Sequence, residues 1–277
     1  MLIDSHAHLN FNAYRKDVDE VIKRSLEGGV WMVNVGSQLG TSRRALEIAG
    51  KYEQGVYAAV GLHPIHVINN IKVKKDAEEL ATKEEEVFDP EEYKRLALSS
   101  PKVVAIGEIG LDYYYRPKTK TKQEVFKNRQ QEIFVDQMDL ALSLDLPIIF
   151  HCRMAHEEML ELISFKHKES NGKLRGVIHC FTGSLEEARK YLKMGIFLGI
   201  NGIIFKMNLD DIIKETPLDM ILTETDCPYL TPPTAKEERN EPLFMKYVVE
   251  RIAAIKNLSY FEVSEKTVIN AKKLFGF

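Results

Sequence analysis

The sequence predicts an α/β fold, a (β/α)8 TIM barrel built as a single domain over residues 1–277. Short runs rich in Val, Ile and Leu alternate with amphipathic segments along the whole chain, and eight such units can be read. The length of 277 residues suits one barrel, which usually needs about 250. We find no domain boundary in the sequence.

The eight runs are expected to form parallel strands. In chain order they are LIDSHAHL, WMVNVGS, VYAAVGLHP, VVAIGEIGLD, LPIIFHC, GVIHCF, IFLGING and MILTETDCP. Several are nearly continuous in aliphatic residues, as in strands buried on both faces, and strand–helix alternation implies right-handed crossovers. An open doubly wound sheet is the alternative, although no Gly-x-Gly-x-x-Gly turn follows the first run.

The segments between the runs carry helix signals. Segment 17–29 has an apolar stripe and stops at paired glycines. Asp89 is placed as an N-cap before Pro90, and Ser184 with Glu187 forms a capping box. Two closing helices follow residue 240, the second opening on another Ser-x-x-Glu box at residues 259–262.

One segment interrupts this rhythm after the third run. Residues 68–88 are dense in Lys and Glu and lack a strong apolar stripe. They predict a charged insertion, either an inert surface excursion or a lid, because a segment that follows a strand's carboxyl end lies over the catalytic face of a barrel.

Composition narrows the functional classes. The net charge is −3 and the isoelectric point is near 6.3. No global basic field exists to grip long duplex DNA, and any nucleic-acid contact must be local or assisted by metal ions. The start of the chain has no signal-peptide pattern, and no apolar stretch reaches the length of about eighteen residues that a membrane span requires.

The three cysteines are far apart and suggest no disulfide framework. Cys152, Cys180 and Cys227 each directly follow a histidine or carboxylate. Alternation therefore turns each thiol toward the helix layer, where a small apolar residue fits. We expect a cytoplasmic protein with no membrane contact and no readable obligate protein partner.

Residue types that bind metals gather at the carboxyl ends of the runs, where TIM-barrel enzymes build their sites. His6 and His8 are two apart and share one face of the first strand. The others are His63 in the third run, Glu108 and Asp112 in the fourth, His151 in the fifth, His179 in the sixth, and Glu224 and Asp226 in the eighth. Four imidazoles and two carboxylates from this set already exceed what one catalytic zinc needs.

These groups predict a centre of two divalent ions, Mg, Mn or Zn. Such a centre lowers the pKa of a shared water and holds the oxygens of a scissile phosphoryl or carbonyl group. The alternative is a polar barrel mouth without metal, which would leave several desolvated groups without partners.

Seven motifs occur together and in order: DSHAHL, GLHP, AIGEIGLDYYY, HCRMAHEEM, HCFTG, GIN and ETDCPYL. With them the chain resembles the TatD-type metal-dependent deoxyribonucleases, which belong to the amidohydrolase-like barrels. The resemblance spans nearly the whole chain. It implies a first ion held by His6, His8, Glu108 and Asp226, and a second held by Glu108, His151 and His179. Glu108 would bridge the two ions, and Asp226 would also act as the general base.

Four further residues are expected to contact substrate, each with a structural alternative. His63 contacts a phosphate or caps the following turn. Arg153 offers a bidentate fork to phosphate or pairs with a glutamate. Asp112 orients a metal ligand or caps a helix, and Glu224 is a supporting acid or a buried partner of Arg153. Tyr113, Tyr114 and Tyr115 stack on bases or pack under their loop.

Two positions depart from the family pattern. Met154 stands where the family usually has aspartate after HCR, which removes a hydrogen bond. The loop TAKEERNEP keeps Lys236 and Arg239, but Glu237 and Glu238 cancel their charge, which weakens the expected contact with a nucleic-acid backbone.

The leading functional hypothesis is a divalent-metal-dependent DNA phosphodiesterase, similar to a 3′-5′ exodeoxyribonuclease, that attacks with a metal-bound hydroxide. Its substrates would be DNA ends or single-stranded DNA. An amide, ester or lactone hydrolase on the same barrel is the alternative, because fold and ligands do not separate these chemistries. Phosphate is favoured by His63, Arg153 and Lys206 near the mouth. A non-catalytic metal-binding protein is the third hypothesis.

Overall fold

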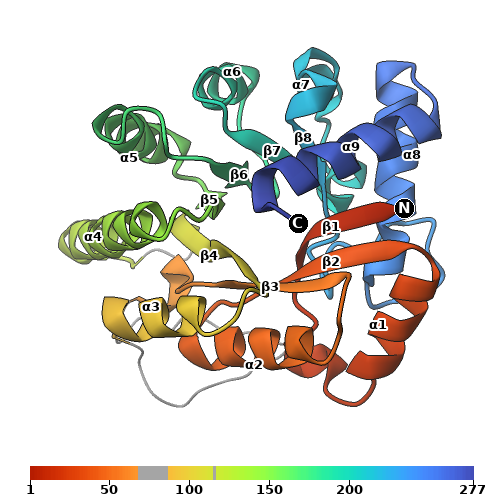
Figure 1. The fold of residues 1–277 in the computed structure, drawn as a ribbon. Helices are drawn as coiled ribbons and strands as arrows, with labels where there is room; N and C mark the ends of the chain where they lie inside the picture. Colours follow the sequence, from red (N-terminus) through yellow and green to blue (C-terminus); the bar gives the residue numbers. More distant parts are fainter. Residues whose placement is uncertain (68–86, 115–116) are drawn as a thin grey trace.

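Eight parallel strands form one sheet in the computed structural model, which describes residues 1–67, 87–114 and 117–277 (Figure 1). The strands are β1 (Leu2–Ala7), β2 (Val30–Val35), β3 (Val56–Val60), β4 (Val103–Asp112), β5 (Ile148–Arg153), β6 (Gly176–Ile178), β7 (Phe197–Ile200) and β8 (Ile221–Thr223). Each strand pairs with the next in chain order from β1 to β8. This order confirms the predicted TIM barrel over the open doubly wound sheet.

The barrel closes where β1 meets β8. Ala7 and Cys227 form an isolated parallel bridge. The Asp226 amide donates to the His6 carbonyl oxygen (2.9 Å), and the His8 amide donates to the Cys227 carbonyl oxygen (2.9 Å). The seam therefore brings the first and last predicted metal-binding motifs together.

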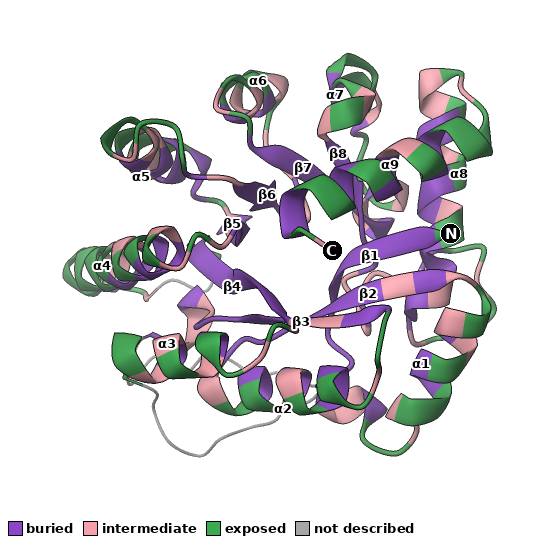
Figure 2. Ribbon diagram, viewed as in Figure 1, coloured by how far each residue is buried: buried purple, intermediate pink, exposed green. Residues whose placement is uncertain are grey.

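Helices surround the sheet and present their apolar sides to it (Figure 2). Within the described ranges they are α1 (Val18–Glu27), α2 (Leu39–Gly50), α3 (Pro90–Leu98), α4 (Lys120–Ser143), α5 (His156–Glu169), α6 (Leu185–Lys193), α7 (Asp210–Glu215), α8 (Met245–Lys256) and α9 (Tyr260–Phe275). Short 3-10 turns are η1 (Asn12–Tyr14), η2 (Pro64–His66), η3 (Gly202–Phe205), η4 (Leu218–Met220) and η5 (Pro242–Phe244). None of these helices is long and apolar enough to cross a membrane.

The helix ends follow the sequence signals. The Asp89 carboxylate accepts from the amides of Glu91 and Glu92 at the start of α3. Capping boxes open α6 at Ser184 and α9 at Ser259. Most of the charged segment expected at 68–88 lies outside the described residues.

Helix α9 crosses the end of the barrel where the strands begin and closes it (Figure 1). Val268, Ala271, Leu274 and Phe275 on this helix pack in one cluster with side chains inside the barrel, among them Ile3. Apolar packing thus fills that end. The buried histidines and carboxylates of the predicted site lie at the opposite end, where the strands finish.

Candidate metal centre

Glu108 lies at the middle of the site. It stands within β4, its side chain is 5% exposed, and its two carboxylate oxygens face different groups of donors. Oε2 lies 3.5 Å from His6 Nε2 and 3.8 Å from His8 Nε2. Oε1 lies 2.5 Å from His151 Nδ1 and 3.3 Å from His179 Nε2.

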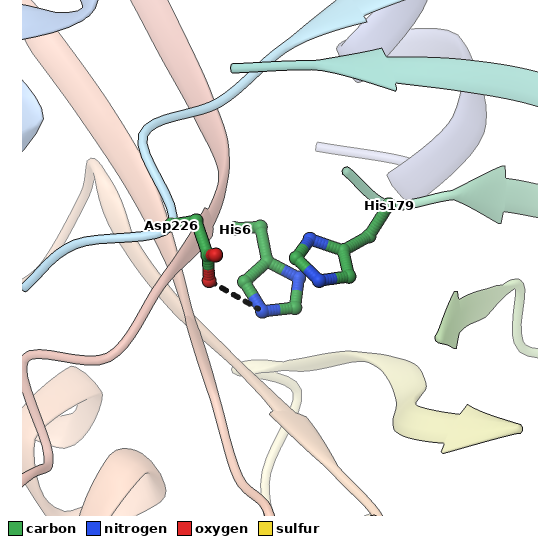
Figure 3. A group of neighbouring side chains, drawn as sticks. All are labelled: His6, His179 and Asp226. Carbon is green, nitrogen blue, oxygen red and sulfur yellow. Dashed lines mark ion pairs between the residues drawn. The ribbon is translucent and has the colours of Figure 1, made fainter. Parts of the chain in front are cut away.

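The first group of donors is completed from across the seam. Asp226 follows β8, and its Oδ1 lies 3.8 Å from His6 Nε2 and 3.5 Å from His8 Nε2. The two histidine Nε2 atoms are 3.0 Å apart. Figure 3 shows the Asp226 carboxylate directed at His6, and His179 on the other side of that ring; the two rings stack with centroids 3.7 Å apart.

In three of the histidines, a hydrogen bond on the side of the ring away from Glu108 sets which nitrogen carries the lone pair. His8 Nδ1 lies 2.9 Å from the Val35 carbonyl oxygen, which can only accept, so Nδ1 carries the hydrogen. His179 Nδ1 faces Glu224 at 3.1 Å and His151 Nε2 faces Asp112 at 3.2 Å. In each neutral ring the lone pair therefore points toward Glu108, as metal-binding histidines require.

His63 has the opposite arrangement. Its Nδ1 accepts from the Ile65 amide (3.1 Å) at the start of η2, so the predicted turn cap is present. Burial, followed by the charge on His151, lowers the pKa of His63 well below its usual value. The neutral ring then carries its hydrogen on Nε2, which lies 3.5 Å from Glu108 Oε1. In this arrangement His63 presents an N–H donor toward Glu108.

The converging donors fit divalent ions. Three groups of ligand atoms each lie within 4.8 Å of one another: His6, His179 and Asp226; His6, His8 and Glu108; and His63, Glu108 and His151. Ions bound at about 2.0–2.2 Å separate neighbouring ligand atoms by about 3.0–3.6 Å, which matches most of the distances above. Imidazole nitrogens and carboxylate oxygens suit zinc and manganese.

Burial and neighbouring charges shift the pKa values of the histidines and of Glu108. Burial lowers the pKa of His6, and His179 lowers it further. Burial acts the same way on His151, but Glu108 and Asp112 together outweigh it and raise the pKa of His151 to about 9. Burial opposes charge on Glu108, yet the surrounding histidines hold the pKa of this carboxyl well below its usual range. A bound cation would take the place of the protons on the histidine nitrogens that face Glu108.

Two of the residues expected to contact substrate are buried carboxylates. Glu224 is fully buried, and its Oε1 accepts from His179 Nδ1, the Cys180 amide (2.7 Å) and Asn201 Nδ2 (3.1 Å). Asp112 is also buried and accepts from His151. Both carboxylates contact histidines of the candidate metal centre, which agrees with Asp112 orienting a ligand and Glu224 acting as a supporting acid. A direct contact of either carboxylate with substrate stays a prediction.

Arg153 does lie at the mouth, with its guanidinium carbon 3.6 Å from the centroid of the Tyr114 ring. Tyr114 is exposed, whereas Tyr113 is buried and packs under its loop; Tyr115 lies outside the described residues. Arg239 donates to the Ala13 carbonyl oxygen and to the Asp17 carboxylate. The loop after β8 therefore uses this arginine for internal contacts.

Sequence reasoning gave no role to Asp4, which is fully buried beside the seam. Its carboxylate accepts from the amides of His6 (3.2 Å) and Thr225 (2.9 Å) and from Thr225 Oγ1 (2.5 Å). These contacts tie the residue before Asp226 to the strand that carries the histidines. A signal was present, because alternation places Asp4 on the same side of β1 as His6.

A family model described as TatD related DNase matches residues 3–276. The chain belongs to the TatD family. It is 39% identical to the uncharacterized metal-dependent hydrolase YabD of Bacillus subtilis, over 99% of both chains. It is 33% identical to the 3′-5′ ssDNA/RNA exonuclease TatD of Erwinia tasmaniensis, over 99% of this chain and 100% of the relative.

The fold agrees with TatD structures. The crystal structure of YjjV, a TatD homologue from Escherichia coli, superposes with a TM-score of 0.80 at 27% identity, covering 100% of this chain and 98% of the other. A TatD-family hydrolase from Entamoeba histolytica gives 0.80 at 25% identity, over 99% and 97% of the two chains. The protein is thus a metal-dependent hydrolase with His, Glu and Asp groups that can bind metal.

Proposed function

We propose that this TatD protein is a phosphodiesterase that uses two divalent ions to remove nucleotides from the 3′ end of single-stranded DNA. One observation carries the proposal: the two oxygens of Glu108 face separate groups of donors, Oε2 toward His6 and His8 and Oε1 toward His151 and His179. A single carboxylate in that position would serve as a ligand to both ions.

Each ion would have its own ligands in this arrangement. The first would be held by His6, His8, Glu108 and Asp226. The second would be held by Glu108 together with His151 and His179. When bound, two such ions polarise the phosphoryl group and lower the pKa of a water between them.

Asp226 is the base that accepts the proton of the attacking water. Burial opposes its charge, but the charge of His179 and the hydrogen bond from His8 lower the pKa of Asp226, so the carboxylate is ionised at neutral pH. Its side chain is 15% exposed and therefore reaches both the donors and the mouth. A base must lie within hydrogen-bond reach of the proton it takes.

Three buried carboxylates position the ligands. Glu224 holds the ring of His179, Asp112 holds the ring of His151, and Asp4 holds the seam on which Asp226 stands. Partners of this kind fix the tautomer and direction of a ligating histidine.

Phosphate is recognised by His63 and Arg153. His63 offers its Nε2 hydrogen beside Glu108, and Arg153 offers a planar fork two residues beyond His151. A nucleic-acid substrate is also supported by the Erwinia relative, whose name describes a ssDNA/RNA exonuclease.

Turnover of a labelled strand tests the proposal. Protein stripped of metal and resupplied with Mg²⁺, Mn²⁺ or Zn²⁺ should release mononucleotides from the 3′ end of a 5′-labelled single-stranded oligonucleotide. Glu108→Ala should abolish the release because both ions lose a shared ligand, whereas Glu157→Ala, an exposed carboxylate on α5, should not. Hydrolysis of an ester or amide substrate instead, with the same metal dependence, would reject the phosphodiesterase.

A further inference from the structure

We propose that residues 117–129, here called the basic arm, bind the phosphates of a single strand several nucleotides away from the scissile bond. The inference rests on the proposed function, because it assigns the surface along which that substrate leaves the metal centre. The basic arm contains the first turns of α4 and the three residues before it.

The basic arm projects past the barrel mouth. The Gln130 side chain accepts from the Asp112 amide (2.9 Å) and donates to the Asp112 carbonyl oxygen (3.1 Å), which sets Gln130 level with the end of β4. The helix begins ten residues earlier, at Lys120. At about 1.5 Å per residue, these residues extend about 15 Å along the helix axis from Gln130.

The loop before the helix is fixed to it. Gln123 Nε2 donates to the Pro117 carbonyl oxygen (2.7 Å). Further along the helix, the Lys127 ammonium lies 4.3 Å from the centroid of the buried Tyr113 ring and 2.6 Å from Glu158 Oε1. The basic arm is therefore anchored at its base, and its outer turns carry the exposed charges.

Those charges have the sign of a phosphate-binding surface. Lys118, Lys120 and Lys122 are exposed, and within the described part of the chain they form no ion pair. The first turn of α4 contains no acidic residue, whereas α5 opens with Glu157 and Glu158. Cations at a helix N-terminus oppose the helix dipole, so helix stability does not account for these lysines.

Arg153 and Tyr114 connect the metal centre to the basic arm. Arg153 belongs to β5, two residues after His151, and its carbonyl oxygen accepts from the Tyr113 amide (2.9 Å). Its guanidinium lies over the Tyr114 ring, which is 51% exposed. An exposed aromatic ring beside a cation stacks on an unpaired base, which favours a single strand over a duplex.

The path has a definite length. A stacked strand advances about 3.4 Å per nucleotide, so the projection of about 15 Å spans about four nucleotides. The basic arm therefore adds contacts only for strands longer than two nucleotides, and these contacts are complete at about six.

The test compares strand lengths in two triple variants. Lys118→Gln/Lys120→Gln/Lys122→Gln removes the exposed charges of the basic arm. Lys168→Gln/Lys173→Gln/Lys193→Gln makes the same charge change at exposed lysines at the end of the barrel where the strands begin. Hydrolysis of oligothymidylates of two to twelve nucleotides gives KM and kcat. Fluorescence anisotropy of a labelled twelve-mer with phosphorothioate linkages gives affinity against salt.

In wild-type protein KM should fall with length up to about six nucleotides. The arm variant should raise the KM of the twelve-mer about tenfold or more and flatten the length dependence without changing kcat. The slope of log affinity against log salt should decrease by about 2, at about 0.7 per phosphate contact. The control variant should match wild type.

An unchanged twelve-mer KM and salt slope in the arm variant would overturn the inference, as would equal losses in the control. If wild-type protein cleaves none of the oligonucleotides, the proposed function fails, and the anisotropy titration still decides the inference. Weaker binding of the twelve-mer by the arm variant alone then supports it, and unchanged binding rejects it.

Discussion

Replacement of Glu224 measures how strongly a buried carboxylate supports the site. Its Oε1 accepts from His179 Nδ1, the Cys180 amide and Asn201 Nδ2. Glu224→Ala leaves these three donors without their acceptor, at about 1–3 kcal/mol for each buried donor. Glu224→Ala should therefore reduce the free energy of unfolding by at least about 3 kcal/mol.

Glu224→Gln separates stability from metal binding. The amide oxygen keeps one acceptor at the same position, so the loss of stability should stay near about 1 kcal/mol. The His179 ring loses its charged partner, and metal affinity should fall about 10–100-fold. Urea unfolding in EDTA measures the first quantity, and titration of the metal-free protein with Mn²⁺ measures the second.

Two results would refute this reasoning. Glu224→Ala with wild-type stability would show that the three donors find other acceptors without cost. Glu224→Gln with wild-type affinity for both ions would show that the carboxylate does not position His179. Glu215→Gln, an exposed carboxylate on α7, controls for the loss of one negative charge.

Two further predictions concern protons and the loop after β8. Metal affinity should rise with pH from about 6.5 to about 9, by up to about tenfold per pH unit for each proton released. The reason is that the His151 ring is protonated below its pKa of about 9 and must lose that proton to bind a metal ion. A pH-independent affinity in calorimetric titrations would contradict this prediction. Arg239→Ala should lower the free energy of unfolding by about 1 kcal/mol, because its contacts with Asp17 are lost. The affinity for a single-stranded oligonucleotide should not change. A loss of that affinity would show that Arg239 contacts the substrate.

The strand order and the grouping of the donors could be predicted because both depend on local pattern. Aliphatic runs between capped helices indicate a parallel barrel, and the carboxyl ends of its strands must meet. His6, His8 and Glu108 therefore could be placed at one end of the fold from residue type and alternation alone.

The supporting contacts could not be predicted, because they join residues far apart in sequence. Asp4 contacts Thr225 across the seam, and no local pattern reports that pair. The expected direction of Cys152 and Cys227 agrees with their burial. Cys180 is partly exposed. It follows the end of β6 at Ile178 and has a positive φ of 45°, so strand alternation does not set the direction of its thiol.

The central feature of the proposed site is a pair of divalent ions that share Glu108. Anomalous diffraction from crystals soaked in Mn²⁺ would locate them. We predict two peaks about 3.5–4 Å apart, one beside Glu108 Oε2 with His6 and His8, the other beside Oε1 with His151 and His179. A single peak, or peaks that do not contact Glu108, would contradict the account.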